Sequence, residues 1–375
     1  MILLIGNYRL DQQQSMQRFA EMMLQGLIAA GVRAELIAPE PILGNFQSAG
    51  SFIAKWLGYV DKFIFFPRQL RKKLAEHPAL LHICDHSNAM YTRWSNSLPV
   101  VVTCHDLLAV RGALGEETNC PASFTGKFLQ RWIVRGLRRA KVIACVSQAT
   151  LRDVRRLVAR NEISPRLEVV TLGLNYPYRK LPRSEAAARL AQVAHVDLSR
   201  PFVLHVGSNA LRKNREGVLR IFATTKDKWN GQLIFAGDPL EPALRSLGEH
   251  FHVIDRVVEV LTPESELLEA LYNCATAFIY PSRFEGFGWP VIEAQACGCP
   301  VICSNAGPLP EVVGESAMMH PAEDEKAFAA DILRLNDAAE RERASAKSLR
   351  NAERFSTPGM IERYIDIYRT LASQL

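Results

Sequence analysis

The sequence lacks the long apolar segments that mark membrane-spanning and secreted proteins. It contains no run of eighteen apolar residues, the length that a membrane-crossing helix needs. Its start, Met1-Ile-Leu-Leu-Ile5, has neither the basic segment nor the cleavage site of a signal peptide, and we expect a first strand there. Together with 48% apolar and 22% charged residues, these absences predict a soluble cytoplasmic protein.

Cysteine pairs at metal-binding spacing are also missing. The chain has eight cysteines, no C-x-x-C occurs, and most of them lie in apolar runs. This pattern favours buried, reduced thiols in a cytosolic protein over disulfides or a zinc site.

Two nucleotide-binding fingerprints are absent as well. No G-x-G-x-x-G opens a strand-to-helix unit, and there is no P-loop. These absences argue against a nicotinamide-dependent dehydrogenase and against an ATPase of the P-loop type.

The length and the charge distribution indicate two domains. A chain of 375 residues is long for one core. Residues 1–180 hold 24 Lys and Arg against 13 Asp and Glu, a net charge of +11, whereas the remainder carries −5. Each half has a series of strands alternating with helices, which predicts an α/β protein with two Rossmann-like parallel sheets. We expect domains over 1–180 and 201–356, a linker over 181–200, and a final helix over 357–375.

Polar side chains follow three expected strands of the first half. Leu80–Cys84 is followed by Asp85-His86, Pro99–Thr103 by Cys104-His105-Asp106, and Val142–Cys145 by Val146-Ser147. Ligands of open α/β sheets gather beyond the carboxyl ends of the strands. His105 is therefore a candidate functional residue, whereas His82, inside its strand, is expected to belong to the core.

The stretch Pro281–Pro300 combines a glycine loop with two carboxylates. The apolar run before it predicts a strand, Gly286 and Gly288 predict a turn, and Pro290 suits the first position of a helix. Loop amides and the helix dipole favour an electron-rich ligand. Glu285 and Glu293 could bind such a ligand, or they could be the acid and base of a hydrolase.

Two basic segments admit more than one interpretation. Ile53–Leu74 is rich in aromatic and basic residues, and Lys127–Arg160 carries many arginines. Either segment could contact an anionic membrane surface. Equally, the aromatic side chains could lie in the core and the arginines on a solvated face.

Taken together, the motifs resemble those of the retaining GT-B glycosyltransferases of family 4 (glycosyl transferases group 1). The resemblance covers nearly the whole chain and is strongest over 201–375. It rests on the following matches, in order: Thr103-Cys-His-Asp-Leu107, Val146-Ser147, Val206-Gly207 with Arg212-Lys213-Asn214, Phe235-Ala-Gly-Asp238, Glu266-Leu-x-x-x-Leu-Tyr272, Pro281-Ser with Glu285-Gly-Phe-Gly288 and Glu293, Gly307 with Pro310-Glu311, and Phe355-Ser356. The first loop departs from it, because Gln14-Ser15-Met16 stands where many relatives have a glycine pair.

The resemblance implies a donor site for a nucleotide diphosphate sugar. Arg212 and Lys213 would stabilise the departing diphosphate, with Gly207 and Ser208 beside it. Glu293 would bind the ribose, and Glu285, Gly286, Phe287 and Gly288 the donor sugar. His105 would approach that sugar from the other domain across a central cleft, and the nucleobase would lie near Val260 and Leu261. The final helix would cross back to the N-terminal domain.

The implied reaction is metal-independent transfer of a hexose with retention, to a saccharide or lipid-linked acceptor, as in polysaccharide biosynthesis. No metal or other cofactor and no nucleic acid is implied, and the chain has no Asp-x-Asp of the metal-holding glycosyltransferases. The resemblance weakly favours mannose, with glucose as the other donor considered. A GT-B nucleotide-sugar epimerase, a phosphorylase and a non-catalytic nucleotide- or carbohydrate-binding protein remain alternatives. Peripheral contact with the inner face of an anionic membrane is a further expectation.

Overall fold

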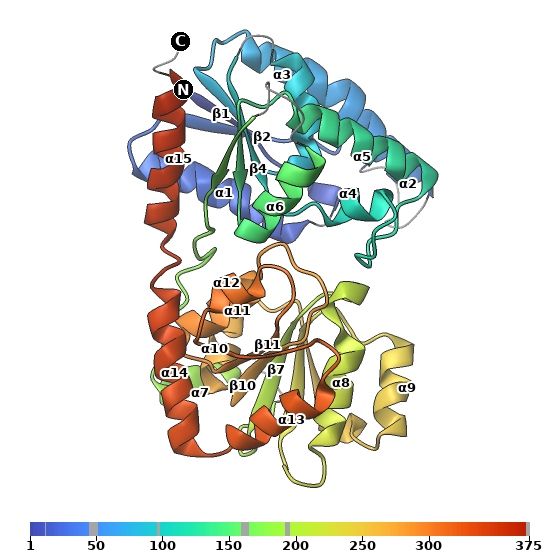
Figure 1. Ribbon diagram of the computed structural model, residues 1–375, viewed down its shortest axis with the longest axis vertical. Helices are drawn as coiled ribbons and strands as arrows, with labels where there is room; N and C mark the ends of the chain where they lie inside the picture. The colour runs from blue at the N-terminus through green and yellow to red at the C-terminus, as the bar shows by residue number, and fades with distance from the viewer. Residues whose placement is uncertain (12, 45–51, 96–97, 159–164, 192–195, 373–375) are drawn as a thin grey trace. The chain divides into compact units, whose positions relative to one another are not determined.

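The protein consists of two compact units. A computed structural model describes residues 1–11, 13–44, 52–95, 98–158, 165–191 and 196–372. One unit comprises Met1–Asn175 with Thr357–Leu375, and the other Tyr176–Ser356 (Figure 1). Each contains a parallel sheet flanked by helices, and we describe each by itself.

In the described residues, the first unit is built on a six-stranded sheet in the order β2-β1-β3-β4-β5-β6, with every strand parallel to its neighbours. Leu and β-branched residues dominate its central strands, as expected for strands buried on both faces. The strands are β1 (Ile2–Ile5), β2 (Ala34–Ile37), β3 (Leu80–Ile83), β4 (Val100–Cys104), β5 (Val142–Cys145) and β6 (Arg166–Val169).

Helices flank the first sheet on both faces (Figure 1), and successive side chains of each strand point to opposite faces. Leu3 and Leu81 share a core with α3 and α5, whereas His82 faces the opposite side, where α1 and α15 lie side by side. The helices of this unit are α1 (Gln14–Ala29), α2 (Phe52–Val60), α3 (Phe66–Leu74), α4 (Leu108–Ala113), α5 (Phe124–Leu137), α6 (Gln148–Leu157) and α15 (Thr357–Ala372).

Helix α15 is anchored to the first sheet by buried polar contacts. The hydroxyl of Tyr368 lies 2.6 Å from Nδ1 of His82, and the hydroxyl of Tyr364 lies 2.7 Å from that of Thr103. Thr103 also contacts Nε2 of His82 at 2.8 Å. These bonds satisfy polar groups that would be costly to bury alone, and they explain how the last helix joins the unit that contains the first strand.

The described part of the second unit also has a six-stranded parallel sheet, in the order β12-β11-β10-β7-β8-β9. The apolar stretch that begins at Val253 becomes a strand only at Val257, because Ile254–Arg256 forms a 3-10 turn before β9. The strands are β7 (Phe202–Gly207), β8 (Gln232–Gly237), β9 (Val257–Leu261), β10 (Ala277–Tyr280), β11 (Val301–Ser304) and β12 (Met318–His320).

Helices cover both faces of the second sheet (Figure 1). Val203 and Ile279 pack with α8, α9 and α13, while Phe278 contacts Tyr272 of α10 on the other face. Within the range 181–200, helix α7 packs against α10 and belongs to this unit. The helices are α7 (Arg183–Leu190), α8 (Arg215–Thr224), α9 (Pro242–His250), α10 (Ser265–Cys274), α11 (Trp289–Ala296), α12 (Leu309–Val313), α13 (Glu325–Arg334) and α14 (Ala338–Ala352).

The segment Ile53–Leu74 forms α2, a π-helical turn over Asp61–Phe65, and α3. Phe66 is buried, and Phe63 packs against Trp132 of α5. Trp56, in contrast, is 50% exposed. The core interpretation therefore holds for Phe63 and Phe66 and not for Trp56. Over the described residues, no helix is both long enough and apolar enough to span a membrane.

Candidate functional site

The loop after β7 brings two cations to the carboxyl edge of the second sheet. Strand β7 ends at Gly207, and a 3-10 turn over Leu211–Lys213 follows. Asn214 then takes a left-handed conformation (φ 53°), and its side-chain oxygen caps α8 by accepting from the amide of Gly217 at 3.3 Å. The short turn explains why Arg212 and Lys213 remain at the strand end.

Two further hydrogen bonds tie this loop to the end of β10. The side-chain amide of Asn214 donates to the carbonyl of Pro281 at 3.0 Å, and the amide of Arg283 donates to the carbonyl of Arg212 at 2.8 Å. The two loops are therefore held as one piece. The dipeptide Arg212-Lys213 and the carboxylate of Glu285 are some 70 positions apart in the chain, and these two loops bring them together.

Lys213, Arg212 and Glu285 form one charged cluster. The ammonium of Lys213 donates to Oε1 of Glu285 at 2.8 Å, and Nη1 of Arg212 donates to Oε2 at 3.2 Å. Lys213 and Glu285 are only 8% and 9% exposed. Burial alone would raise the pKa of Glu285, but the charges of Lys213 and Arg212 hold that pKa below its usual value. Glu285 is therefore ionised and fixes both cations.

Tyr280, the last residue of β10, completes this cluster. Its hydroxyl accepts a hydrogen bond from the ammonium of Lys213, which also lies 4.8 Å from the centre of the ring. Burial lowers the pKa of Lys213, and Glu285 opposes this shift. Tyr280 was not among the site residues predicted from the sequence. Its position directly before Pro281-Ser was the available signal, because the last residue of a parallel strand lies at the ligand edge.

Glu293 is held inside the first turns of α11. It is 4% exposed, and its Oε2 accepts a hydrogen bond from the hydroxyl of Tyr272 at 3.1 Å. The charge of Glu293 also raises the pKa of Lys213, so the two residues are electrostatic neighbours. The sequence motif that ends at Tyr272 did not predict this contact, because Glu293 lies on another helix.

The glycine loop before α11 contributes mainly its backbone. Gly288 takes a left-handed conformation (φ 101°), where an added Cβ would lie 2.8 Å from Leu309. The side chain of Phe287 is buried and packs on Phe355. Gly286 is half-buried. The expected contributions of Gly286, Phe287 and Gly288 to sugar binding would therefore have to come from main-chain groups.

Val260 and Leu261, the expected nucleobase residues, lie at the carboxyl end of β9, which is two strands away from β7 in the sheet. Val260 and Leu261 pair with Ala236 and Gly237 of β8. Leu261 is 57% exposed and Val260 is buried. Gly237 approaches Gly207 so closely that an added Cβ would lie 2.5 Å from the Gly207 carbonyl oxygen. Beside Gly207, Ser208 is exposed. Strands β7, β8 and β9 therefore present one continuous edge.

His105 lies in the first unit, at the carboxyl end of β4. Its Nε2 is 2.9 Å from the carbonyl of Cys84, which identifies Nε2 as the protonated nitrogen. Burial lowers the pKa of the imidazole, so it is neutral, and Nδ1 has no partner among the described residues. Its ring packs edge-on against Phe19. The expected catalytic histidine is thus rigidly held, with an unused acceptor nitrogen.

A polar cluster lies at the same edge of the first unit, after β1 and β3. The side-chain amide of Asn7 donates to Oδ2 of Asp85 at 2.6 Å and to Gln13, and the hydroxyl of Ser87 donates to Asp85. Gln14, Ser15 and Met16 begin helix α1. The residues Gln14-Ser15-Met16, which depart from the family pattern, therefore form the first turn of α1. The hydrogen bond between Asn7 and Gln13 lies directly before this turn.

Comparison with known proteins assigns both halves of the chain. Residues 16–176 match the family model described as Glycosyltransferase Family 4, and residues 200–337 match Glycosyl transferases group 1. The O-antigen chain mannosyltransferase B of Escherichia coli is 31% identical over 263 residues, covering 65% of each protein. A D-inositol 3-phosphate glycosyltransferase of Acidothermus cellulolyticus is 28% identical over 294 residues, which cover 74% of this chain and 62% of the relative. The chain thus spans slightly less than two thirds of these relatives.

Solved structures share the fold. The sucrose-phosphate synthase of Thermosynechococcus elongatus has a TM-score of 0.79 at 20% identity, covering 100% of this chain and 99% of that one. The Anabaena protein HepE, solved in complex with UDP and glucose, has a TM-score of 0.75 at 15% identity, with 98% of both chains covered. The fold is therefore GT-B, as expected from the sequence. From the two family models together, the chain belongs to the group 1 and family 4 glycosyltransferases.

Proposed function

We propose that the protein transfers a hexose from a nucleotide diphosphate sugar to a saccharide or lipid-linked acceptor, with retention at the anomeric carbon. The observation that carries this proposal is the pairing of Lys213 and Arg212 with Glu285 at the carboxyl ends of β7 and β10. Two cations are held beside the loop where a diphosphate would lie.

The charged cluster suits the departure of the nucleotide diphosphate. When the bond between the anomeric carbon and the diphosphate oxygen breaks, negative charge builds on the phosphates. Lys213 is buried and already positioned, so it can stabilise that charge without reorganisation. The acceptor hydroxyl would attack from the same face, and its proton would pass to a phosphate oxygen. We assign the leaving-group role to these cations and propose that the reaction proceeds without a metal.

The relatives suggest the donor. The Escherichia coli relative is a mannosyltransferase, and the Anabaena structure holds UDP and glucose. We propose mannose or glucose as the transferred sugar, Glu293 as the ribose ligand and Val260–Leu261 as the nucleobase contact. Glu285 would meet the donor sugar while it holds Lys213. His105, whose Nδ1 can accept a hydroxyl proton, would contact the same sugar.

We also propose that the protein contacts anionic membrane through helix α5. Phe124 and Phe128 are 89% and 64% exposed, and lie one turn apart. Lys127 and Arg131 are exposed on the same helix. Aromatic and basic residues together suit an interface with anionic lipid, where a lipid-linked acceptor would be found.

The test begins with a panel of nucleotide sugars scored by thermal stabilisation, because a ligand of the folded state raises its melting temperature. The stabilising donor is then incubated with candidate acceptors in the presence of EDTA. We expect nucleotide diphosphate to be released only when an acceptor is present. Release of nucleotide diphosphate without an acceptor would favour an epimerase or a hydrolase. Release that depends on added phosphate would favour a phosphorylase. Binding of the nucleotide sugar without turnover would favour a non-catalytic protein.

A further inference from the structure

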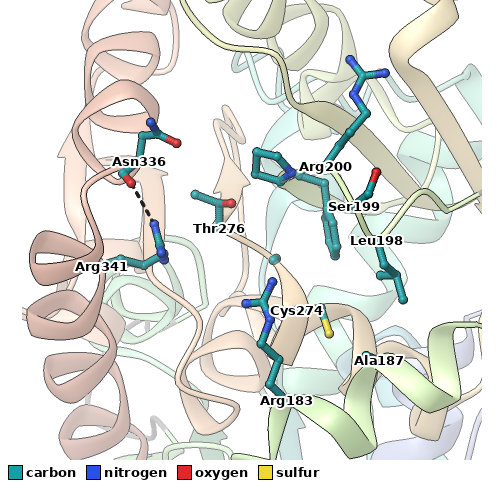
Figure 2. A pocket seen from close by; sticks show the side chains of 12 residues that line it. Arg183, Ala187, Leu198, Ser199, Arg200, Cys274, Thr276, Asn336 and Arg341 are labelled. Carbon is teal, nitrogen blue, oxygen red and sulfur yellow. Dashed lines mark hydrogen bonds between the residues drawn. The ribbon is translucent and has the colours of Figure 1, made fainter.

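The second unit has a pocket at the amino ends of its strands, whereas the candidate donor site lies at their carboxyl ends. Its volume is about 270 Å³, and it is lined by residues at the amino ends of β7 and β10, including Phe202 and Thr276 (Figure 2). Strand β7 has six residues, so roughly 20 Å of strand separates Phe202 from the loop beyond Gly207. A molecule in this pocket cannot be the diphosphate that Lys213 would contact.

Two guanidinium groups point toward the middle of this pocket. Figure 2 shows Arg183, from the start of α7, and Arg341, from α14, extending toward the space beside Thr276. Nη1 of Arg341 donates to the carbonyls of Leu335 and Asn336, at 2.8 and 3.1 Å. Nε and Nη2 are not used in these bonds and could donate to a ligand. The charge of Arg183 reaches Cys274 and partly offsets the raised pKa that burial gives that thiol.

Among the described residues, neither guanidinium has a carboxylate within ion-pair distance. The pKa of Asp337 is lowered chiefly because its carboxylate accepts a hydrogen bond from the amide of Glu340 at 2.9 Å, and the charges of Arg343 and Arg341 lower it further. The third arginine of the lining, Arg200, turns away from the pocket and bonds to Asn230 at 2.7 Å. The pocket therefore has two guanidinium groups without an ion-pair partner among the described residues, although the charge of Asp337 acts on Arg341 from a greater distance.

A polar group that suits an oxyanion lies between these charges. Thr276 is 6% exposed and lines the pocket, and its amide donates to the carbonyl of Phe202 at 2.8 Å. Two guanidinium groups with a hydroxyl can bind the several oxygens of a phosphate group. The pocket volume leaves room for a small group attached to that phosphate.

We propose that this pocket binds a phosphate monoester of a small metabolite, at a site separate from the donor site. Arg183 and Arg341 bind the phosphate oxygens, and Thr276 donates its hydroxyl to them. The ester group occupies the space between α7 and the start of β7.

The test is isothermal titration calorimetry of the full chain with glucose 6-phosphate, inorganic phosphate and glucose as probes. We expect one site for glucose 6-phosphate, weaker binding of inorganic phosphate, and none of glucose. Arg183→Ala and Arg341→Ala should each weaken binding about tenfold or more, because each removes a charged hydrogen-bond donor. Arg200→Ala and Arg343→Ala are the matched controls, since neither guanidinium points into the pocket, and both should bind as the unmodified protein does.

A Lys213→Ala variant separates this site from the donor site and should bind glucose 6-phosphate unchanged. Thermal unfolding and circular dichroism identify variants that fail to fold. Absence of binding at millimolar probe, unchanged binding in folded Arg183→Ala and Arg341→Ala variants, or loss of binding in Lys213→Ala would each overturn the proposal.

Discussion

The ammonium of Lys213 lies 2.8 Å from Oε1 of Glu285, and both groups are buried at the ends of two neighbouring parallel strands. The ammonium also donates to the hydroxyl of Tyr280, and because an ammonium has three donors, one is left for a second anion. The pair is therefore suited to receive a phosphate oxygen at a position that is set before the substrate binds.

Replacing Lys213 tests its role in stabilising the leaving group. We expect Lys213→Ala to lower kcat about 100-fold or more, as is typical when one stabilising donor is removed from a transition state. Lys228→Ala, at an exposed lysine of the same unit, is the control and should retain full activity. Steady-state kinetics with the donor identified by the panel measure both. A Lys213→Ala enzyme with unchanged kcat would exclude this role.

Replacing Glu293 tests its role in binding the ribose. Glu293→Ala should weaken the binding of the nucleotide diphosphate by roughly 10- to 100-fold, because a carboxylate that accepts hydroxyl protons is lost. Tyr272→Phe removes the donor that lies 3.1 Å from Glu293 and should have a smaller effect. Calorimetry measures both, with the exposed Glu315→Ala as the control. Equal affinities for Glu293→Ala and Glu315→Ala would contradict the assignment.

The two core histidines predict a loss of stability in acid. Burial is the main cause that lowers the pKa of both His82 and His205 to about 3. Below the unfolded pKa of about 6.5, the unfolded chain binds protons that the folded chain does not. Each histidine should therefore reduce the free energy of unfolding by about 1.4 kcal/mol per pH unit between about pH 6.5 and 3.

Denaturant titrations of the unmodified protein and of His82→Gln at pH 7 and pH 5 measure this effect. Glutamine keeps hydrogen-bonding groups toward Tyr368 and Thr103 but does not titrate in this range. The variant should lose less stability between the two pH values, by about 2 kcal/mol. An identical pH dependence in both proteins would mean that His82 is not the acid-sensitive group.

Helix α5 predicts binding to anionic vesicles. At low salt, vesicles that contain anionic lipid should retain the protein, and salt should release it. The double variant Phe124→Ser/Phe128→Ser should lose most of this retention because its apolar anchor is gone. Ile28→Ser changes an exposed apolar residue of α1 instead and should be retained normally. Sedimentation with the vesicles is the readout, and failure of the unmodified protein to bind would rule out the membrane contact.

The stretch from Pro281 to Pro300 was predictable in detail because its structure is local. A strand that ends at a proline, two glycines in a loop and a proline at the start of a helix restrict the backbone without help from the rest of the chain. Gly288 and Gly298 do take left-handed conformations. The start of β9 is less local: Val253 and Ile254 are typical strand residues, yet Ile254–Arg256 forms a 3-10 turn and the strand begins at Val257.

The partners of the site residues were not predictable in this way. Glu285 was expected to face a sugar, and its bonds to Lys213 and Arg212 depend on how two loops about 70 residues apart are tied together. Tyr272 ends one of the matched motifs, but that motif does not indicate Glu293 as its partner, and Tyr280 lies outside the matched motifs. Their roles follow from side-chain directions on the sheet and on α10.

By itself, the sequence determined the α/β class, the family and the strand ends that carry polar groups, and it indicated candidate residues for a donor site. These follow from periodicity and from short motifs whose backbone conformations are local. Only the tertiary structure decided that α15 joins the first sheet through His82 and Tyr368, that α7 belongs to the second unit, and that Arg183 and Arg341 share a pocket. Such contacts join residues far apart in the chain, and packing against buried surfaces determines which of them form.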